Sequence, residues 1–287
     1  MKPQILAIDC GNTNIKWALF AAATTVPRVL QSGAFATNSV REELALLVAT
    51  VVHFATIANQ LQTLKVMISN VAGSAVADAF KYAFSTHAAS LHFVESQAVS
   101  CGMHNGYVPP HTLGVDRFAA LVAAHKQPQN QLVVMAGTAL TIDALNQTGQ
   151  FLGGIIVPGL RTMQDALYQG TAQLPRVAND ALICAFPTHT VAAIASGAMQ
   201  ACVGAVVMQA LAHARALRTT HENVVRIVIA GGAATAMLPH LEIAVAAAFA
   251  AAFAAAGSAA APVIVMQPNL VLEGLFYLAA ATIAPTV

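Results

Sequence analysis

Charged residues are scarce in this sequence, and their scarcity excludes several classes of protein. Lys, Arg, Asp and Glu together make up 9% of the 287 residues, the formal net charge is +1, and no basic run occurs. Because binding to nucleic acid depends on clustered Lys and Arg, no nucleic-acid partner is expected. Hydrophobic residues make up 57% of the chain, which excludes a disordered protein and predicts one large or two ordinary domains. The remaining classes favour small-molecule chemistry.

Cysteine pairs and a signal-peptide pattern are also absent. The four cysteines are scattered and form no CxxC pattern: Cys10, Cys101, Cys184 and Cys202. This spacing favours neither a disulfide framework nor a zinc ribbon, so reduced thiols and a cytoplasmic location are expected. The N-terminal stretch lacks an apolar region followed by a small-residue cleavage site, so we expect no signal peptide.

One uncharged segment, between Glu242 and Glu273, exceeds the length of about 20 residues that a membrane span requires. It is mostly alanine, which favours helix but is only weakly apolar, and Pro262 interrupts it. Phe249 and Phe253 are four residues apart and share one helical face, as in a soluble helix that packs on a core. We therefore expect no association with a membrane.

The standard motifs for nucleotide binding, metal binding and hydrolysis are missing. The chain has no Walker A sequence, no GxGxxG, no HExxH and no GxSxG. Cys101, His104 and His111 share one loop, but their spacing matches no standard zinc site. Any phosphate or metal site therefore depends on other loops.

Hydrophobic periodicity and turn residues predict two halves with a similar order of elements. Each half opens with three strands, at 4–10, 15–20 and 26–35 and again at 131–136, 140–145 and 151–157. Further helices are predicted at 39–60, 74–87, 116–125, 190–218 and 270–284, and further strands at 65–69, 91–94 and 224–230. In both halves the first strand leads into a glycine turn, at Gly11 and at Gly137. We expect an α/β fold of two duplicated domains, 1–112 and 113–287, facing each other across a central cleft. The sequence does not fix the place of the last helix, which could pack back on the first domain.

Gly11, Asn12 and Thr13 form the first of three clusters that could carry chemistry. A glycine lets backbone N–H groups approach an anion, and the amide and hydroxyl side chains add donors, so the loop is suited to phosphate. Asp9 is placed to hold a divalent cation, directly or through water, and Lys16 could offset phosphate charge. The alternative is an ordinary hairpin turn, in which Asn and Gly are common.

The second cluster lies where a loop enters the helix predicted at 116–125. Asp116 could accept a proton from a substrate hydroxyl, while Arg117 could hold an anion. The alternative is structural, because an acidic residue near a helix start commonly stabilises the helix. The two side chains are adjacent in sequence and point in different directions, so each requires its own partner.

The third cluster is the glycine turn at 137–139, followed by Thr141 and Asp143 on one face of a strand. Three such clusters in one chain favour a shared ligand, although threonine is also a common strand residue. Gly231 and Gly232 follow a later apolar strand and could let a nucleotide lie close to the backbone. The alternative for this pair is a strand-to-helix turn without a ligand.

Taken together, these clusters resemble the type III pantothenate kinases, which have the fold of the acetate and sugar kinases and of actin. The matching segments are Ile8-Asp9-Cys10-Gly11-Asn12-Thr13-Asn14-Ile15-Lys16-Trp17, Leu113-Gly114-Val115-Asp116-Arg117 and Gly137-Thr138-Ala139-Leu140-Thr141-Ile142-Asp143. Further matches are Tyr107 with Pro110, Gly153-Gly154-Ile155 with Pro158-Gly159, Thr190 with Ile194 and Gly197, Gly231-Gly232, and Leu270-Val271-Leu272-Glu273-Gly274-Leu275. The resemblance implies duplicated actin-like, ribonuclease H-like domains, each a mixed sheet flanked by helices.

The resemblance also implies a reaction, the ATP-dependent phosphorylation of pantothenate to 4′-phosphopantothenate, the first step of coenzyme A biosynthesis. Asp116 would be the general base, and Asp9 would organise Mg²⁺. The residues expected to contact ATP are Asp9, Gly11, Asn12, Thr13, Lys16, Gly137, Thr138, Ala139, Gly231 and Gly232. Those expected to contact pantothenate are Tyr107, Gly114, Arg117 and Thr190, in a pocket that this family completes across a homodimer interface.

One position departs from the family pattern. Members use a monovalent cation, K⁺ or NH₄⁺, and usually place an aspartate just before the Ala-Gly-Thr-Ala turn, where this chain has Met135. A thioether binds hard cations poorly, so the usual ligand set is incomplete. A tryptophan that commonly follows the Asp-Arg pair is replaced by Phe118, which we interpret as a packing change. Asp9 and Asp116 are retained, so catalysis is expected.

Two other functions stay open at the level of sequence. One is a kinase for another small hydroxylated substrate, such as a sugar, with the same phosphate loops and a different pocket around Tyr107 and Thr190. The other is a nucleotide-binding regulator that has lost activity. The methionine at position 135 is the observation that suggests this function.

Overall fold

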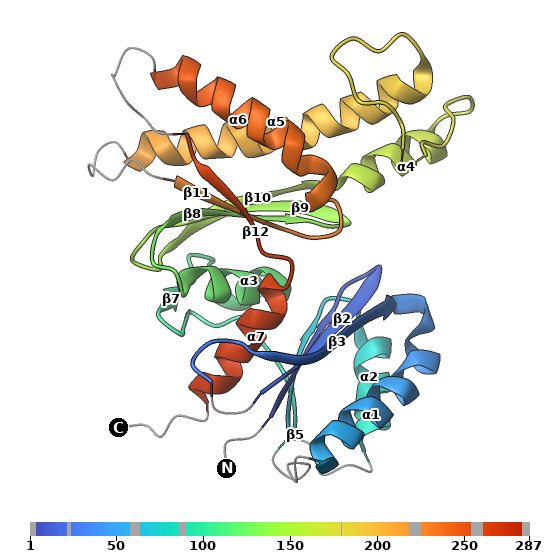
Figure 1. The fold of residues 1–287 in the computed structure, drawn as a ribbon, viewed down its shortest axis with the longest axis vertical. Coiled ribbons are helices and arrows are strands. Elements are labelled where there is room, and N and C mark those ends of the chain that lie inside the picture. Colours follow the sequence, from blue (N-terminus) through green and yellow to red (C-terminus); the bar gives the residue numbers. More distant parts are fainter. Residues whose placement is uncertain are drawn as a thin grey trace. The chain divides into compact units, whose positions relative to one another are not determined.

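The computed structural model describes residues 4–21, 24–57, 64–85, 90–178, 180–217, 225–253 and 261–282. The chain divides into two compact units. Unit 1 comprises Met1–Gln127 and Asn269–Val287, and unit 2 comprises Pro128–Pro268. Each unit contains one five-stranded sheet with helices packed against it (Figure 1).

Unit 1 has the strand order β3-β2-β1-β4-β5. Its strands are β1 (Ile5–Cys10), β2 (Asn14–Phe20), β3 (Val29–Ala36), β4 (Lys65–Asn70) and β5 (Ser90–Phe93), and its helices are α1 (Val40–Ile57), α2 (Ser74–Phe84), α3 (Val115–His125) and α7 (Leu270–Ala281). A short hairpin of β6 (Val99–Ser100) and β7 (Met103–His104) lies in the loop before α3. β1 pairs antiparallel with β2 and parallel with β4, so the sheet is mixed.

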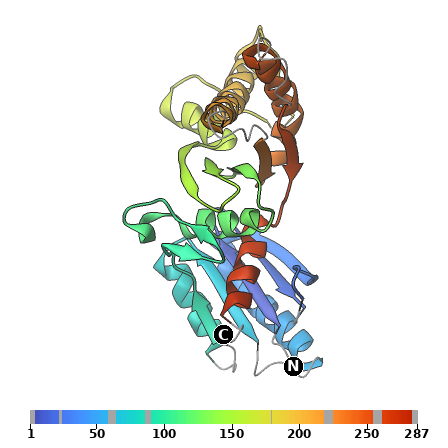
Figure 2. The same ribbon diagram turned by 90° about the vertical axis from the view of Figure 1, so that its left-hand side faces the viewer.

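The two faces of this sheet carry different side chains, because successive residues of a strand point to opposite sides. Leu6 and Ile8 belong to the apolar core that also includes residues of α1 and α2. Asp9 therefore points to the other face, on which α7 packs and Phe20 meets Phe276 with ring centroids 5.2 Å apart. Figure 2 shows α7 lying across these strands.

Unit 2 repeats the same topology. Its strand order is β10-β9-β8-β11-β12, with β8 (Asn130–Ala136), β9 (Ala139–Leu145), β10 (Phe151–Pro158), β11 (Val225–Ala230) and β12 (Val263–Met266). Its helices are α4 (Leu160–Gly170), α5 (Thr190–Leu217) and α6 (Ala234–Phe253). In both units the first three strands form an antiparallel meander and the next two are added in parallel beside the first. The predicted α/β fold with duplicated mixed sheets is confirmed.

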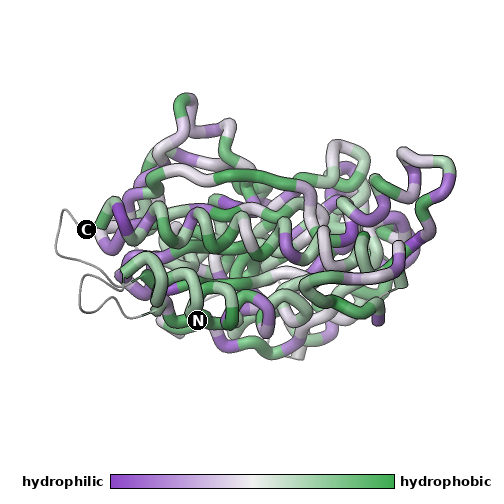
Figure 3. Tube along the Cα trace, turned by 90° about the horizontal axis from the view of Figure 1, so that it is seen from above, coloured by the Kyte–Doolittle hydropathy of each residue, from purple (hydrophilic) through white to green (hydrophobic). Residues whose placement is uncertain are grey.

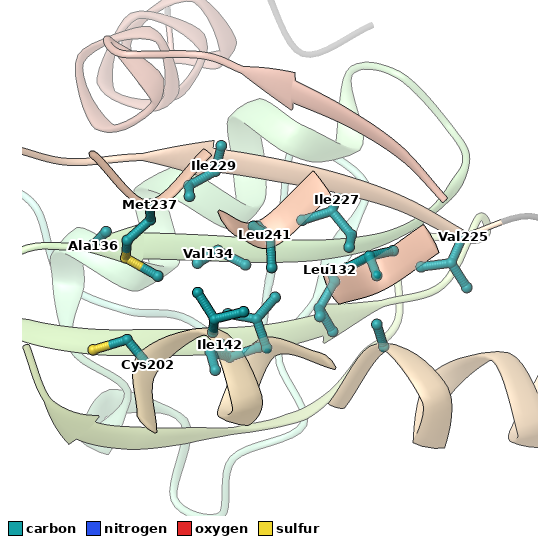
Figure 4. Close-up of a cluster of buried hydrophobic side chains, with 14 of the residues drawn as sticks. Leu132, Val134, Ala136, Ile142, Cys202, Val225, Ile227, Ile229, Met237 and Leu241 are labelled. Carbon is teal, nitrogen blue, oxygen red and sulfur yellow. The ribbon is translucent and has the colours of Figure 1, made fainter. Parts of the chain in front are cut away.

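The core of unit 2 lies between its sheet and the helices α5 and α6. Leu132, Val134, Ile227 and Ile229 of the strands meet Leu241 of α6, as Figure 4 shows. Burying such aliphatic side chains stabilises the fold by roughly 1.5–3 kcal/mol each relative to exposure. This packing fixes the strand ends from which the glycine turns emerge.

Helices α5 and α6 are long and apolar enough to cross a membrane by length and composition alone. Both pack on the sheet of unit 2: α6 buries Met237, Leu241 and Val245 at helical spacing, and continues the stripe to Phe249 and Phe253. The two phenylalanine rings are 5.4 Å apart, on one face as expected from their spacing. Along the trace, hydrophilic residues interrupt the apolar stretches (Figure 3). The apolar faces of these helices are therefore explained by a protein core.

The units divide the chain differently from the expected boundary between 112 and 113. Helix α3 belongs to unit 1 because it packs against α7 and β4. The last helix, which the sequence assigned to neither domain, also lies in unit 1. There a Cβ atom on Gly274 would come within 1.9 Å of the Ala119 carbonyl oxygen, so the close approach of α7 to α3 requires glycine.

Most predicted elements are present within three residues of their expected ends. Neither α4 nor β12 was predicted, and α6 was expected only as a helical face carrying Phe249 and Phe253. The expected ends at Gln60, His87, Arg218, Val224 and Ala284 lie outside the described residues. The loop at 101–113 contains the β6–β7 hairpin and a short 3₁₀ turn at Pro110–Thr112.

Candidate active site

Three polar residues form a row across the central strands of unit 1. Asp9 on β1 is paired in register with Lys16 on β2 and with Ser69 on β4. Neighbouring strands are about 4.8 Å apart, so side chains in one register row and on one face are close neighbours. The row lies on the face opposite to the α1–α2 core, where the alternation of the strand places Asp9.

Asp116 occupies the first turn of α3, with Gly114 as the N-cap residue. Its Oδ1 accepts a hydrogen bond from the Arg117 backbone N–H at 2.8 Å. A Cβ atom on Gly114 would lie 2.8 Å from the same oxygen, so glycine leaves room for the carboxylate. Asp116 is only partly buried, and its side chain is accessible to a ligand.

Asp116 is close enough to Asp9 to affect its pKa electrostatically. Burial raises the pKa of Asp9, the negative charge of Asp116 raises it further, and Lys16 and the Ser69 hydroxyl lower it, with a resulting value of about 7. A carboxylate whose ionised form is disfavoured in this way gains from a nearby cation. The pair therefore has the charge and the oxygen ligands that a divalent metal prefers.

The loop between β1 and β2 is a tight hairpin turn. The Gly11 N–H donates to the Asn14 carbonyl at 3.1 Å, and the Thr37 hydroxyl donates to the Gly11 carbonyl at 2.7 Å. The side chains of Asn12 and Thr13 are exposed. The hairpin interpretation is therefore correct for the backbone, and it leaves these two side chains at the surface beside Asp9.

Tyr107 and Arg117 form a second polar group beside Asp116. The Arg117 side chain is buried, it donates from Nη1 to the Tyr107 hydroxyl at 3.0 Å, and its guanidinium lies 5.4 Å from the centre of the tyrosine ring. Asn105 holds the tyrosine loop: its Oδ1 accepts from the Tyr107 N–H, and its Nδ2 donates to the Pro110 carbonyl. A hydroxyl and a guanidinium are thus fixed near the start of α3.

In unit 2 the turn between β8 and β9 is held by the start of α4. The Thr138 carbonyl accepts hydrogen bonds from the Gly159 N–H at 2.9 Å and from the Thr162 hydroxyl at 2.6 Å. A Cβ atom on Gly159 would come within 2.0 Å of the Gly137 carbonyl oxygen. These contacts hold the turn in place. Its residues Gly137, Thr138 and Ala139 are exposed, so the turn is open to a ligand.

The Gly231-Gly232 turn lies directly beside the end of β8. Gly231 has a φ of 101°, and a Cβ atom there would be 2.4 Å from the Ala136 carbonyl oxygen. The same carbonyl accepts a hydrogen bond from the Ala233 N–H just before α6. Two glycine turns and the N-termini of α4 and α6 therefore meet at one end of this sheet, an arrangement that favours anions.

Comparison with known proteins decides the family. The family model for type III pantothenate kinase matches residues 5–213. This chain belongs to the type III pantothenate kinase family. A type III pantothenate kinase of Janthinobacterium sp. (strain Marseille) is 39% identical over 251 residues, which cover 84% of this chain and 91% of that protein. One from Nitrosospira multiformis is 32% identical over 283 residues, covering 98% and 93%.

Solved structures with little sequence identity share the fold. A protein of Campylobacter jejuni, described as a Baf family transcriptional activator, has a TM-score of 0.53 at 16% identity and covers 96% of this chain and 98% of its own. A glucokinase from an Antarctic psychrotroph has a TM-score of 0.50 at 14% identity, covering 98% and 100%. The expected fold class, that of the sugar kinases, is confirmed by these similarities.

The structure groups the predicted residues of this family member within each unit. Unit 1 brings together Asp9, Lys16 and Asp116, with Tyr107 and Arg117 beside Gly114. Unit 2 brings together the turns at 137–139 and 231–232, while Thr190 is exposed at the first position of α5. The meeting of the two groups in one cleft stays a prediction.

Two contributors escaped the sequence analysis. Ser69 joins the Asp9 row through the β1–β4 pairing, and Thr37 fixes the glycine loop from the end of β3. A signal existed for Ser69, since it is a polar residue directly after the apolar run at 66–68. Among the described residues no three His, Cys, Asp or Glu side chains are grouped to hold a metal, so Cys101, His104 and His111 form no such centre.

Proposed function

We propose that this protein phosphorylates pantothenate with ATP, giving 4′-phosphopantothenate for coenzyme A biosynthesis. The family supports the reaction, and the observation that carries it is the pair of interacting carboxylates, Asp9 and Asp116, within one unit. Phosphoryl transfer requires mainly positioning and charge stabilisation, together with a group that accepts the proton of the attacking hydroxyl. The site contains side chains of each kind.

Asp116 is the proposed general base. Its Oδ1 is engaged by the Arg117 N–H, which leaves Oδ2 for the hydroxyl proton of the acceptor alcohol. Gly114 keeps the space beside the carboxylate clear. The residue therefore accepts a proton at a defined oxygen while the first turn of α3 holds it in place.

Phosphate binding is proposed for the glycine turns. Gly11, Asn12 and Thr13 with Lys16 would contact phosphates from unit 1, and Gly137, Thr138 and Ala139 would do so from unit 2. Gly231 and Gly232 would lie against the nucleotide, because a turn without Cβ atoms admits a ligand close to the backbone.

The residues present fit a magnesium ion. Asp9 supplies a carboxylate oxygen, a hard ligand, and its raised pKa of about 7 is the consequence of a buried negative charge that a cation would offset. Asp9 would hold Mg²⁺ directly or through water. When bound, Mg²⁺ neutralises part of the phosphate charge, while Lys16 on the adjacent strand contributes a second positive charge.

Pantothenate binding is proposed for Tyr107, Gly114 and Arg117, with Thr190 completing the pocket. The Tyr107–Arg117 hydrogen bond orients two donors beside the base, which suits a substrate with a carboxylate and hydroxyl groups. Because the family completes this pocket across a dimer interface, we propose a homodimer. Light scattering of the purified protein would test the oligomeric state.

This chain lacks one ligand that the family usually provides for its monovalent cation. The position before the glycine turn is Met135, and its register neighbours Thr141 and Ala230 are neutral. A thioether replaces a carboxylate there, so we assign no step to K⁺ or NH₄⁺.

A cytoplasmic location is proposed, since all four cysteines are free thiols, as in a reducing compartment.

A coupled assay of ADP release tests the proposed function. Pantothenate should stimulate ADP release strongly, and mass spectrometry should detect 4′-phosphopantothenate as the product. Sugars and other hydroxylated compounds serve as parallel acceptors. A sugar accepted in preference to pantothenate would favour the other kinase, and nucleotide binding without turnover would favour a regulator.

A further inference from the structure

Ser69, near the end of β4, is a buried polar residue next to the proposed magnesium ligand. Its side chain has no exposed surface. Its Oγ forms no hydrogen bond of regular geometry with any described residue. Such a buried hydroxyl is unfavourable for folding alone, because it has lost its hydration without gaining a regular hydrogen bond.

The strand register defines what the hydroxyl faces. Ser69 is the register partner of Asp9 in the parallel β1–β4 pair. Val66 and Ile68 of β4 point into the α1–α2 core, so the alternation of the strand turns Ser69 to the opposite face, which is also the face of Asp9. The hydroxyl is close enough to the Asp9 carboxylate to lower its pKa.

We propose that Ser69 is a positioning residue that donates its hydroxyl to one oxygen of ionised Asp9 and turns the other oxygen toward Mg²⁺. This inference rests on the proposed role of Asp9. Carboxylates that bind metals are commonly held by such hydrogen bonds from neighbouring groups. Lys16 lies on the β2 side of Asp9, so Ser69 provides the donor on the β4 side.

Calorimetry with a non-hydrolysable ATP analogue measures this effect without relying on activity. Each protein is titrated in Mg²⁺ and again in EDTA, and the ratio of the two affinities gives the contribution of the metal. In Ser69→Ala this contribution should fall by roughly 10-fold, the scale of lost support for a metal ligand, while the affinity in EDTA stays unchanged. The Mg²⁺ concentration for half-maximal activity should rise in parallel, with KM for pantothenate unchanged.

Two further variants separate positioning from packing. Ser69→Thr keeps the hydroxyl and should retain most of the metal contribution. Met67→Val alters a buried side chain on the same strand and face, and should lower the melting temperature without changing the metal contribution.

A metal contribution in Ser69→Ala equal to that of the unaltered protein would overturn the inference, as would an equal loss in Ser69→Ala and Met67→Val. Failure of the proposed function has a different signature. In that case Asp9→Asn would keep the full metal contribution, or the unaltered protein would release no ADP in response to pantothenate.

Discussion

Asp9, at the end of β1, and Asp116, in the first turn of α3, carry interacting carboxylates. Burial and then the charge of Asp116 raise the pKa of Asp9 to about 7. One strand and one helix that are distant in sequence thus concentrate negative charge at one place. Such an arrangement costs stability in the free protein and becomes favourable when a cation binds.

The first prediction concerns the stability of the free protein. An aspartate titrates near 3.9 in an unfolded chain, so the proton on Asp9 stabilises the fold fully below about pH 4, and this contribution is lost as the pH rises through about 7. Asp9→Asn carries no charge, and should therefore be more stable than the unaltered protein at pH 8 by up to about 4 kcal/mol. Its advantage should shrink as the pH is lowered toward 4.

Calorimetric melting curves from pH 4 to 8, without nucleotide or Mg²⁺, measure this difference. Glu95→Gln removes an exposed carboxylate of unit 1 and serves as the control, with little change expected. An Asp9→Asn advantage that does not depend on pH would contradict the electrostatic explanation.

The sequence predicts local structure well, and the pairing of distant strands less well. Short β-rich runs on either side of glycine turns predict the strands β1, β2, β8 and β9. The Ser69–Asp9 neighbourhood depends on the pairing of β1 with β4, which no local pattern specifies. Helix α4 was missed although Leu160, Met163 and Leu167 recur at helical spacing, so a signal for it was present in the sequence.

The boundary between the units illustrates the same limit. Composition places a loop before α3, and a domain boundary there is a reasonable prediction. Helix α3 nevertheless packs on α7, from the other end of the chain, through the contact of Gly274 with Ala119. Packing of this kind depends on contacts between residues that are distant in sequence, and no local sequence pattern specifies those contacts.

The second prediction tests the general base. Asp116→Asn removes the proton acceptor and keeps the size of the side chain, so turnover should fall by at least roughly 100-fold. Affinity for a non-hydrolysable ATP analogue, measured by calorimetry, should be kept. Near-normal turnover would mean that another group accepts the proton.

The third prediction tests the contact between α7 and α3. In Gly274→Ala the added Cβ atom would lie 1.9 Å from the Ala119 carbonyl oxygen, which forces the helices apart and should destabilise the protein by roughly 1–3 kcal/mol. Displacement of α3 also moves Asp116, so turnover should fall as well. Urea denaturation and steady-state kinetics measure the two effects.

Gly204→Ala is the matched control for this substitution. Gly204 lies inside α5, and an added Cβ atom there would meet no atom within 4 Å. Because alanine favours helix, the control should gain roughly 0.5–1 kcal/mol. A loss of stability at Gly204 similar to that at Gly274 would show that the close helix contact is not the cause.

The last prediction concerns the methionine at the end of β8. Because Met135 offers a thioether where the family usually has a carboxylate, rates in K⁺ and Na⁺ buffers of equal ionic strength should differ by less than about tenfold, which corresponds to about 1.4 kcal/mol. Met135→Asp should increase the preference for K⁺, since it restores a hard oxygen ligand beside the glycine turn. Met135→Leu keeps an apolar side chain and should behave like the unaltered protein. A steep K⁺ requirement in the unaltered protein would instead place the cation on ligands other than the side chain at position 135.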